Sequence, residues 1–566
     1  MPRWWSARIW WNGAVLRRPV LAVLVALALV PALRGPPAAT ERALPTGPAA
    51  AGAAVELPAA LELRPLQTSA DRRIVDDLGR DVLLRGANVN SLAEYWEVVP
   101  GLGPTIALTD DDYESMAANG FSVVRLLLTW SRVEPVRGDI DEAYLDEVSA
   151  VVDELAARGI YTVLDMHQDA YSAFISTTDP AACPAGTTPA KGWDGAPSWA
   201  VLTDGLSTCL TNGDRNSSPA VNRAWNNFYD DVDGIRTSFA EMWGAVAARF
   251  SGRPEVAGYD VLNEPETSVP SAELQPKYEA LLVDVIGEIR AAEEGAEFDH
   301  IVFVEPTVPA GTISNGIVIP DPEAAGISIE NISASVHNYS ESIGGGSIEG
   351  LNKAIDTFTA GLGIPNWGGE YGFWDTSPET LAKARRYAAD EDRLAWGGAW
   401  WQWRQSCGDP HAVSWSGGVV VPGTGTSTHL NLLGCPDDTD LGPNEDFLAI
   451  LGRSYPRATP GRIVELRSDP DTGNMVVKAA AGAGDVGRQL VVWTPTEAGG
   501  AHPVTTSGLV DVVELDLPGA RIITATVEAP GDYELWIGPV DEEPPGEPEG
   551  EAPGAAPVTG RPGYTG

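Results

Sequence analysis

Two glutamates close two short apolar stretches of the chain, about a hundred residues apart. Glu264 lies in an Asn-Glu-Pro tripeptide directly after the apolar run 256–262, and Glu370 lies in the segment Gly-Gly-Glu-Tyr-Gly at 368–372. Both stretches are typical of buried parallel strands that end in a turn. Two carboxylates facing each other across a groove can cleave a glycosidic bond, because one protonates the leaving oxygen while the other meets the anomeric carbon.

Other polar and aromatic side chains also lie within or just after predicted strands: Arg125, His167, Asp169, His337, Tyr339, Trp401 and Trp403. The carboxyl ends of barrel strands meet on one face, so these residues are expected to converge on one pocket. The alternative for Glu264 is a rim carboxylate that only pairs with an arginine such as Arg125. The number of strand-end polar residues favours the pocket.

Rival carboxylates exist near the proposed pair. Glu305 also ends a strand and precedes a proline, while Asp165, Asp169 and Glu266 lie close to the site in sequence. We rank Glu305 second because no asparagine precedes it. Asp169 is expected to bind a sugar hydroxyl, and the alternative is that it only caps its loop.

The elements that must position these residues alternate along the chain. Strands are predicted at 82–89, 121–128, 160–166, 256–262, 301–304, 333–336, 364–369 and 395–402, and helices at 109–118, 140–155, 224–250, 272–291, 348–362 and 378–390. This rhythm favours an α/β fold of the (β/α)8 TIM-barrel type over an open doubly wound sheet. No glycine-rich phosphate turn follows any of these strands, which argues against nucleotide binding.

The two ends of the chain differ in texture from the barrel region at 71–455. Short strands separated by Gly, Pro, Asp and Thr at 456–540 predict a C-terminal antiparallel β-sandwich domain, and the Pro-, Gly- and Glu-rich tail at 541–566 is expected to be disordered. At the N-terminus, four arginines precede a short apolar run at 20–30. Residues 1–35 are therefore interpreted as a signal peptide or membrane anchor, and 36–70 as an Ala/Pro-rich linker.

The apolar run is shorter than the roughly 20 residues of a spanning helix, so export is preferred over anchoring and we expect a secreted, extracellular protein. The formal charge of -42, from 37 basic and 79 acidic residues, would repel a phosphate backbone and excludes nucleic acid as a partner. The cysteines form two local pairs, which predicts disulfides joining Cys183 to Cys209 and Cys407 to Cys435. Their spacing does not fit a zinc site, and no metal is expected.

The order of these residues resembles glycoside hydrolase family 5. The resemblance is carried by Arg125, His167, Asn263-Glu264, His337-x-Tyr339, Glu370 and Trp401, each at its own strand end. Within that family, Asp-Met-His-Gln-Asp at 165–169, Gly-Ala-Pro-Ser-Trp-Ala at 195–200 and the appended sandwich resemble endoglycoceramidases and their endo-galactosylceramidase relatives. The likeness runs from about residue 83 to 535.

The resemblance implies a role for each residue. Glu264 would be the general acid/base and Glu370 the nucleophile, and Asn263 would bind the sugar 2-hydroxyl. His337 and Tyr339 would orient the pair, Arg125 would keep Glu370 ionised, and Trp401 would stack beneath the sugar, with His167 at the same rim. Carboxyl groups about 5–5.5 Å apart would give retention of configuration through a glycosyl-enzyme ester, which is the outcome we expect.

The loop after the third strand is rich in apolar residues, among them Trp193, Trp199, Val201 and Leu202. Such a loop could accept the lipid part of a glycolipid, with Trp199 contacting the substrate; the alternative is that these residues form the core of the loop around its disulfide. One departure concerns the first strand. Some endoglycoceramidases place a lysine after it to hold an outer sugar, whereas this chain has Ser-Leu-Ala-Glu-Tyr at 91–95.

We therefore expect a secreted retaining endo-β-glycosidase that releases a glycan from the ceramide of a glycosphingolipid. It would need no cofactor, act as a monomer and meet its substrate at a membrane or micelle surface. One alternative is a family 5 enzyme acting on a polysaccharide or on a steryl, aryl or alkyl β-glucoside. The other is a catalytically inactive carbohydrate-binding protein, against which the presence of both glutamates argues.

Overall fold

The computed structural model describes residues 58–539, apart from 178, 267–270, 308–320, 344, 417, 418, 422, 424, 427, 428 and 497–501. The predicted signal or anchor segment at 1–35, the linker up to residue 57 and the tail at 541–566 lie outside the described residues. Within the described part of the chain, no helix is both long enough and apolar enough to cross a bilayer.

The centre of the fold is a closed barrel of eight parallel strands. In order around the barrel they are β4 (Arg85–Val89), β5 (Val123–Leu128), β6 (Tyr161–Met166), β7 (Val256–Asp260), β8 (Ile301–Val304), β9 (Ile332–His337), β10 (Asn366–Tyr371) and β11 (Gly398–Trp400). β11 pairs with β4 and closes the ring. Each strand overlaps a segment predicted as a strand, with β9 and β10 extending one or two residues beyond the predicted limits, and the (β/α)8 fold is confirmed. Nearly every barrel-strand residue is buried, because helices cover the outside and side chains fill the inside.

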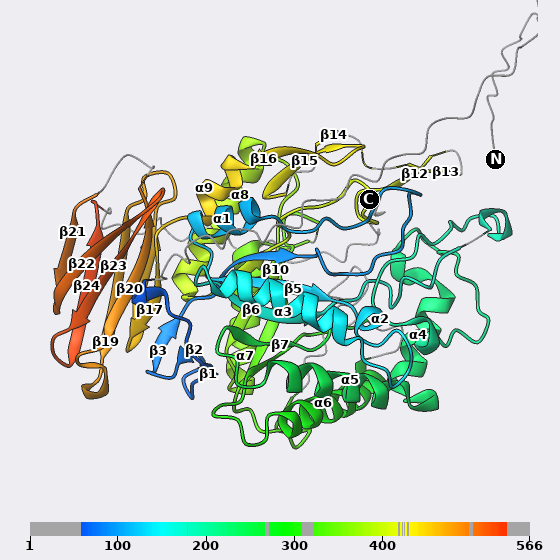
Figure 1. Cartoon of the computed structure of the whole chain (residues 1–566), viewed down its shortest axis with the longest axis horizontal. Helices are drawn as coiled ribbons and strands as arrows, with labels where there is room; N and C mark the ends of the chain where they lie inside the picture. Colours follow the sequence, from blue (N-terminus) through cyan, green and yellow to red (C-terminus); the bar gives the residue numbers. More distant parts are fainter. Residues whose placement is uncertain are drawn as a thin grey trace, which may run out of the picture. The chain divides into compact units, whose positions relative to one another are not determined.

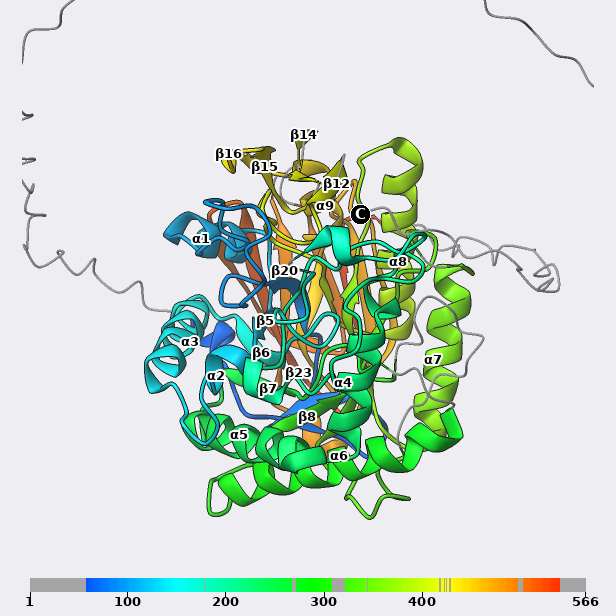
Figure 2. The same cartoon turned by 90° about the vertical axis from the view of Figure 1, so that its right-hand side faces the viewer.

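Helices surround these strands, and Figure 2 shows the larger ones as a ring around β5 to β8. They are α1 (Asp110–Ala118), α3 (Glu142–Ala156), α5 (Ile235–Phe250), α6 (Ser271–Ala292), α7 (Ile348–Leu362) and α8 (Pro378–Leu394), with α2 (Trp130–Val133), α4 (Pro219–Tyr229) and α9 (Glu445–Leu451) in the connections. The prediction of a single helix at 224–250 is wrong. This segment is two helices, because Asp231, Asp233 and Gly234 between them adopt φ of 52°, 56° and 71°.

The C-terminal region forms two antiparallel sheets, as the sequence predicts (Figure 1). Their strands are β17 (Tyr455–Pro460), β18 (Arg462–Ser468), β19 (Met475–Ala481), β20 (Gln489–Pro495), β21 (Val504–Ser507), β22 (Leu509–Leu517), β23 (Ala520–Val527) and β24 (Gly531–Ile537). One sheet has the order β18-β19-β24-β21. The other has the order β1-β2-β3-β17-β20-β23-β22 and includes strands from the start of the described chain.

Those N-terminal strands correct the expected domain limits. β1 (Leu66–Thr68) lies in the predicted linker, and β2 (Ile74–Asp76) and β3 (Arg80–Val82) lie in the segment assigned to the barrel. β3 pairs with β17, with Val82 opposite Ala458, so all three strands belong to the sandwich sheet. Strands of three residues are too short to show a period of two, so their sequence could not reveal this pairing.

Both predicted disulfides are present, each in a long loop on the carboxyl side of a barrel strand. Cys183 bonds Cys209 in the loop after β6, and Cys407 bonds Cys435 in the loop after β11. The second loop also carries the short strands β12 (Ser414–Ser416), β13 (Val419–Val421), β14 (Gly425–Thr426), β15 (Asn431–Cys435) and β16 (Thr439–Pro443).

The sandwich packs directly on the barrel at the end of α1. The Tyr455 hydroxyl donates a hydrogen bond of 2.7 Å to the carbonyl oxygen of Gly120. Gly120 has a φ of 75°, and a Cβ added there would lie 2.4 Å from the ring of Trp493. The buried Arg453 adds ion pairs of 3.0 Å to Glu391 and to Asp392 of α8. Position 120 therefore requires glycine for two separate reasons, its positive φ and the overlap of any Cβ with Trp493.

We expect the change Gly120→Ala to destabilise the protein more than Gly138→Ala. Gly138 has a φ of 76° with nothing within 4 Å of an added Cβ, so its substitution costs only the backbone strain, about 1–2 kcal/mol. Overlap with Trp493 should add about 1–3 kcal/mol at position 120. Urea unfolding of both variants measures the difference, and equal losses would contradict the packing described here.

Candidate active site

The two glutamates lie together at the carboxyl ends of their strands. Glu264 follows β7 and Glu370 is the penultimate residue of β10. One carboxylate oxygen of each, together with a ring nitrogen of His337, lie within 4.8 Å of one another. The side chains are 14% and 5% exposed, so both are enclosed but neither is sealed from solvent. The structure thus brings together the pair that the sequence singles out.

Arg125 lies beneath this pair, in the middle of the barrel, and is completely buried. Its Nη1 donates to Glu370 Oε1 at 2.8 Å, which is the contact expected for it. The same guanidinium contacts three more carboxylates, with distances of 2.8 Å to Asp165, 3.0 Å to Asp260 and 2.9 Å to Glu305. Buried charges require such partners, so Arg125 and the four acids form one unit.

His337 bridges the two glutamates. Its Nδ1 is 3.0 Å from Glu264 Oε1 and 3.4 Å from Glu370 Oε2, and its Nε2 is 3.3 Å from Glu305 Oε1. Burial alone would lower the pKa of His337, but the surrounding carboxylates, Glu305 and Glu370 first, raise this pKa well above its ordinary value. The surrounding carboxylates therefore favour the protonated imidazolium form of His337. A Cβ at Gly369 would lie 2.9 Å from His337 Nε2, which explains a glycine directly before the second glutamate.

Tyr339 completes the surroundings of Glu370. Its hydroxyl donates to Glu370 Oε2 at 2.8 Å, so each oxygen of this carboxylate accepts one hydrogen bond from a fixed donor, Arg125 on one side and Tyr339 on the other. The ring of Tyr339 stacks on Trp374, with ring centroids 5.6 Å apart. Glu370 is consequently held in one orientation.

The rival Glu305 has a different environment. It is 1% exposed, and its Oε2 accepts a hydrogen bond of 2.7 Å from the backbone N–H of Glu264. Burial raises the pKa of Glu305 to about 8, with a further contribution from Asp260, against the opposing effects of His337 and Arg125. Glu264 itself has a φ of 39°, a conformation that Glu rarely adopts. The contact to Glu305 supports this backbone, so Glu305 positions Glu264 from inside the barrel.

Asn263, His167 and Trp401 lie against the same site. Asn263 Oδ1 accepts from Arg125 at 3.0 Å, and its Nδ2 donates to the carbonyl of Gln168 at 3.0 Å. His167 Nδ1 is 2.8 Å from Asp165, and its ring stacks on the indole of Trp401 at 5.3 Å and 18°. One face of Trp401 is thus already covered by protein, and the indole is 5% exposed.

Arg215 is a site residue that the sequence analysis did not identify. It comes from the 3₁₀ turn Arg215–Ser217 in the loop after β6, and its Nη2 is 2.6 Å from Asp169 and 3.1 Å from Glu264. Burial raises the pKa of Glu264, but the hydrogen bond and charge of His337 and the charge of Arg215 outweigh it, and the net shift is downward. Arg215 and His411 likewise outweigh burial at Asp169 and lower its pKa to about 2.

Trp199, predicted to bind substrate, is not brought to the glutamates. Its indole N–H donates to the carbonyl of Glu134 at 3.0 Å, and its ring packs edge-on against Trp130 at 5.2 Å. Trp199 thus packs on the segment after β5, so it is neither the predicted substrate contact nor part of a core around the disulfide of its own loop. Trp193 lies closer to the site, 4.9 Å beneath the guanidinium of Arg215.

Two further groups were not assigned a role from the sequence. Asp260 is the last residue of β7 and pairs in register with Asp165 of β6, so an acid at the end of an apolar strand was a usable signal. Asp194 is completely buried and forms an isolated bridge with Asp169, which joins the loop to the rim. Asp194 lies in a loop, 25 residues after Asp169, so its sequence position does not indicate that it belongs to the site.

Among the described residues, three groups of histidine and carboxylate side chains are close enough to hold a cation: His167 with Asp169 and Asp194, Glu264 with His337 and Glu370, and Asp165 with Asp260 and Glu305. Each group already contains or contacts a protein cation. Arg215 contacts Asp169 and Glu264, and Arg125 contacts Glu370 and the third group. The expectation of a metal-free enzyme remains a prediction.

Comparison with known proteins agrees with this geometry. The family model for cellulase (glycosyl hydrolase family 5) matches residues 75–406. Endoglycoceramidase I of Rhodococcus hoagii is 26% identical over 494 residues, which cover 82% of this chain and 86% of the relative. The crystal structure of an endogalactoceramidase matches with a TM-score of 0.74 and 34% identity, over 84% of this chain and 100% of the other.

A third match is endo-glycoceramidase II from Rhodococcus sp., solved as a lactosyl-enzyme intermediate. It has a TM-score of 0.60 and 25% identity, over 83% of this chain and 100% of the other. The family model spans more than half of the chain and includes both glutamates, Arg125 and Arg215. The protein belongs to glycosyl hydrolase family 5 and is a glycoside hydrolase related to the endoglycoceramidases.

Proposed function

We propose that the protein is a retaining endo-β-glycosidase that cleaves the bond between a glycan and ceramide. The observation that carries the retaining mechanism is the approach of the two carboxylates, with oxygens within 4.8 Å. Retaining enzymes hold their carboxyl groups about 5–5.5 Å apart, whereas inverting enzymes need a wider gap to admit water. The lactosyl-enzyme intermediate of the Rhodococcus relative supports the same chemistry.

In the first step Glu370 attacks the anomeric carbon and forms a glycosyl ester, while Glu264 gives its proton to the leaving glycosidic oxygen. In the second step Glu264 takes a proton from water, which attacks the anomeric carbon and releases Glu370. The nucleophilic role of Glu370 fits its contacts, because Arg125 and Tyr339 each donate a hydrogen bond to one of its two oxygens. Asn263, next to Glu264, is assigned to the sugar 2-hydroxyl.

A lipid leaving group is supported by the distribution of exposed apolar residues. Trp96 follows β4, Phe174 follows β6, Ile343 follows β9 and Trp374 follows β10, and these side chains are 36–46% exposed. Loops after barrel strands all lie on the face that carries the catalytic residues. An added Cβ at Gly192 would lie 3.0 Å from Trp96 Cβ and 2.8 Å from the Ala173 carbonyl, so the first two segments are neighbours. We therefore place the ceramide, within a micelle or membrane, at this rim.

We also infer that the protein acts as a monomer outside the cytoplasm. Two disulfides are typical of proteins in oxidising compartments. The basic and apolar pattern of residues 1–35 supports export, although that segment lies outside the described residues.

The catalytic assignment predicts different behaviour for the two glutamates. Glu370→Gln should lower the hydrolysis of a glycosphingolipid at least about a thousandfold, because no ester can form. Glu264→Ala should keep slow cleavage of an aryl β-glycoside with a good leaving group, and added azide should yield a β-glycosyl azide, since azide replaces the water that Glu264 activates.

Thin-layer chromatography of the glycolipid reaction should show free oligosaccharide and intact ceramide, and NMR should identify the anomer of the azide product. Glu379→Gln, an exposed change in the first turn of α8, serves as the control and should keep the parent rate. An α-glycosyl azide would refute retention. Release of sugar only from a β-glucan or a steryl glucoside would refute the ceramide assignment, and full activity of Glu370→Gln would refute the site.

The lipid-facing rim predicts an effect that depends on how the substrate is presented. The double variant Trp96→Ser/Phe174→Ser should lose about tenfold in activity on a micellar glycolipid while hydrolysing a soluble aryl glycoside at the parent rate. The control Val464→Ser/Val513→Ser removes exposed apolar residues from the sandwich and should change neither rate. Equal losses on both substrates would contradict a role in lipid binding.

A further inference from the structure

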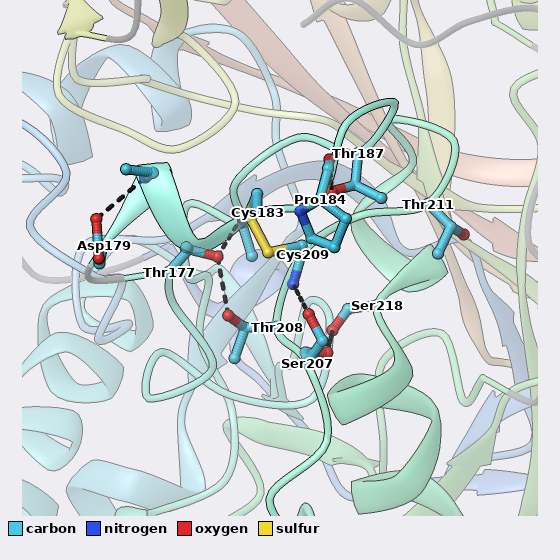
Figure 3. Close-up of a disulfide and its surroundings, with 12 residues drawn as sticks. Thr177, Asp179, Cys183, Pro184, Thr187, Ser207, Thr208, Cys209, Thr211 and Ser218 are labelled. Carbon is cyan, nitrogen blue, oxygen red and sulfur yellow. Dashed lines mark hydrogen bonds between the residues drawn. A yellow bond between two sulfur atoms is a disulfide. The ribbon is translucent and has the colours of Figure 1, made fainter.

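The long loop between β6 and α4 is fixed at several points before it reaches the active site. The disulfide between Cys183 and Cys209 closes it, and the hydroxyls of Thr177 and Thr208 are hydrogen bonded at 2.9 Å beside the disulfide (Figure 3). The Cys209 N–H donates to Ser207 Oγ at 3.1 Å, also drawn in Figure 3. The disulfide and these hydrogen bonds thus join distant parts of the loop to one another.

The 3₁₀ turn that carries Arg215 is fixed within this loop. The side chain of Asp214 accepts from the N–H of Asn216 at 2.8 Å, and Ser217 Oγ donates to the Asp214 carbonyl at 2.6 Å. The N–H of Thr211 in turn donates to Ser217 Oγ at 3.1 Å. These local bonds set the direction in which Arg215 leaves the turn.

From this turn the guanidinium reaches two carboxylates at once. A single nitrogen, Nη2, is 2.6 Å from Asp169 Oδ1 and 3.1 Å from Glu264 Oε2. The ring of Trp193 lies 4.9 Å from the guanidinium carbon, and the side chain is only 24% exposed. Glu264 Oε1 is bound by His337 at 3.0 Å, so Arg215 and His337 hold one oxygen each and fix the orientation of the carboxylate.

We propose that Arg215 is a positioning residue that orients the acid/base Glu264 and divides its own charge between Glu264 and Asp169. This inference rests on the proposed function of Glu264. The acid/base must be protonated in the first step and ionised in the second. The guanidinium of Arg215 favours the ionised form of Glu264. Asp169 weakens this effect, because its own negative charge pairs with the same guanidinium.

The charged groups that face Glu264 come from several elements, and each must be considered in a pH test. They are Arg215 from the loop turn, Asp169 from the start of the same loop, Glu266 from the segment after β7, His337 from β9, Glu370 from β10 and Glu305 from the segment after β8. The two cations, His337 and Arg215, together outweigh burial, so the pKa of Glu264 lies below its ordinary value. Each of these two cations therefore opposes protonation of Glu264.

These charges determine the direction in which each variant should shift the pH profile. The alkaline limb of kcat/KM reports loss of the proton from Glu264 in the free enzyme. Arg215→Gln removes a cation, so the pKa of Glu264 rises and the limb should move to higher pH by about one unit. Asp169→Asn removes an anion, so the limb should move to lower pH. Arg215→Lys keeps the charge and should restore most of the parent profile.

Arg137→Gln provides a matched control. Arg137 also lies over a tryptophan of the same loop, 5.3 Å from the ring of Trp199, but its hydrogen bonds go to Ser238 and to the carbonyls of Asp233 and Gly234. Its loss should leave the limb in place. The profiles are measured on the full chain with an aryl β-glycoside whose leaving group needs protonation, and circular dichroism checks the fold of each variant.

The outcomes separate this inference from the proposed function. A parent enzyme that hydrolyses no β-glycoside would refute the function itself. An active parent whose alkaline limb is the same in Arg215→Gln, or moves to lower pH, would refute the role of Arg215 alone. Shifts of opposite sign in Arg215→Gln and Asp169→Asn, with an unchanged Arg137→Gln, would support it.

Discussion

The whole active site depends on one buried cation. Arg125 is fully enclosed by the barrel, and its guanidinium contacts carboxylates from β6, β7, the segment after β8, and β10. Removing such a charge from water is costly unless partners of opposite sign surround it, and the same holds for each acid. The barrel interior therefore has one arrangement in which every charge is paired. In that arrangement the orientation of Glu370 is already determined, and Glu305 lies beneath the backbone of Glu264.

Much of the fold could be predicted because its signals are local. Most barrel strands overlap a short, largely apolar run, and polar residues at or just beyond their carboxyl ends mark the catalytic face. Glu264, Glu370 and His337 all follow from this rule. The paired spacing of the cysteines gave both disulfides for the same reason, since each bond closes a loop of under thirty residues.

The features that escaped prediction depend on contacts between distant segments. In the sequence Arg215 cannot be distinguished from other loop arginines. Only the fold of the disulfide-bonded loop after β6 brings it to Glu264. The sequence around Trp199 does not indicate that its indole contacts Glu134 and not the catalytic glutamates. The break between α4 and α5 was missed because the apolar pattern continues across it, while the two aspartates and the glycine that cause it occupy only a few positions.

The pairing of β3 with β17 has a consequence for how the molecule is assembled. The sheet joins residues near 80 to residues near 458, and only two residues separate β3 from the first barrel strand. During synthesis the N-terminal strands leave the ribosome long before their partner exists, so this sheet can close only after the whole barrel has been made. The barrel and the sandwich are thus not separable modules, and a cut at residue 455 would leave an open strand edge beside the start of the barrel.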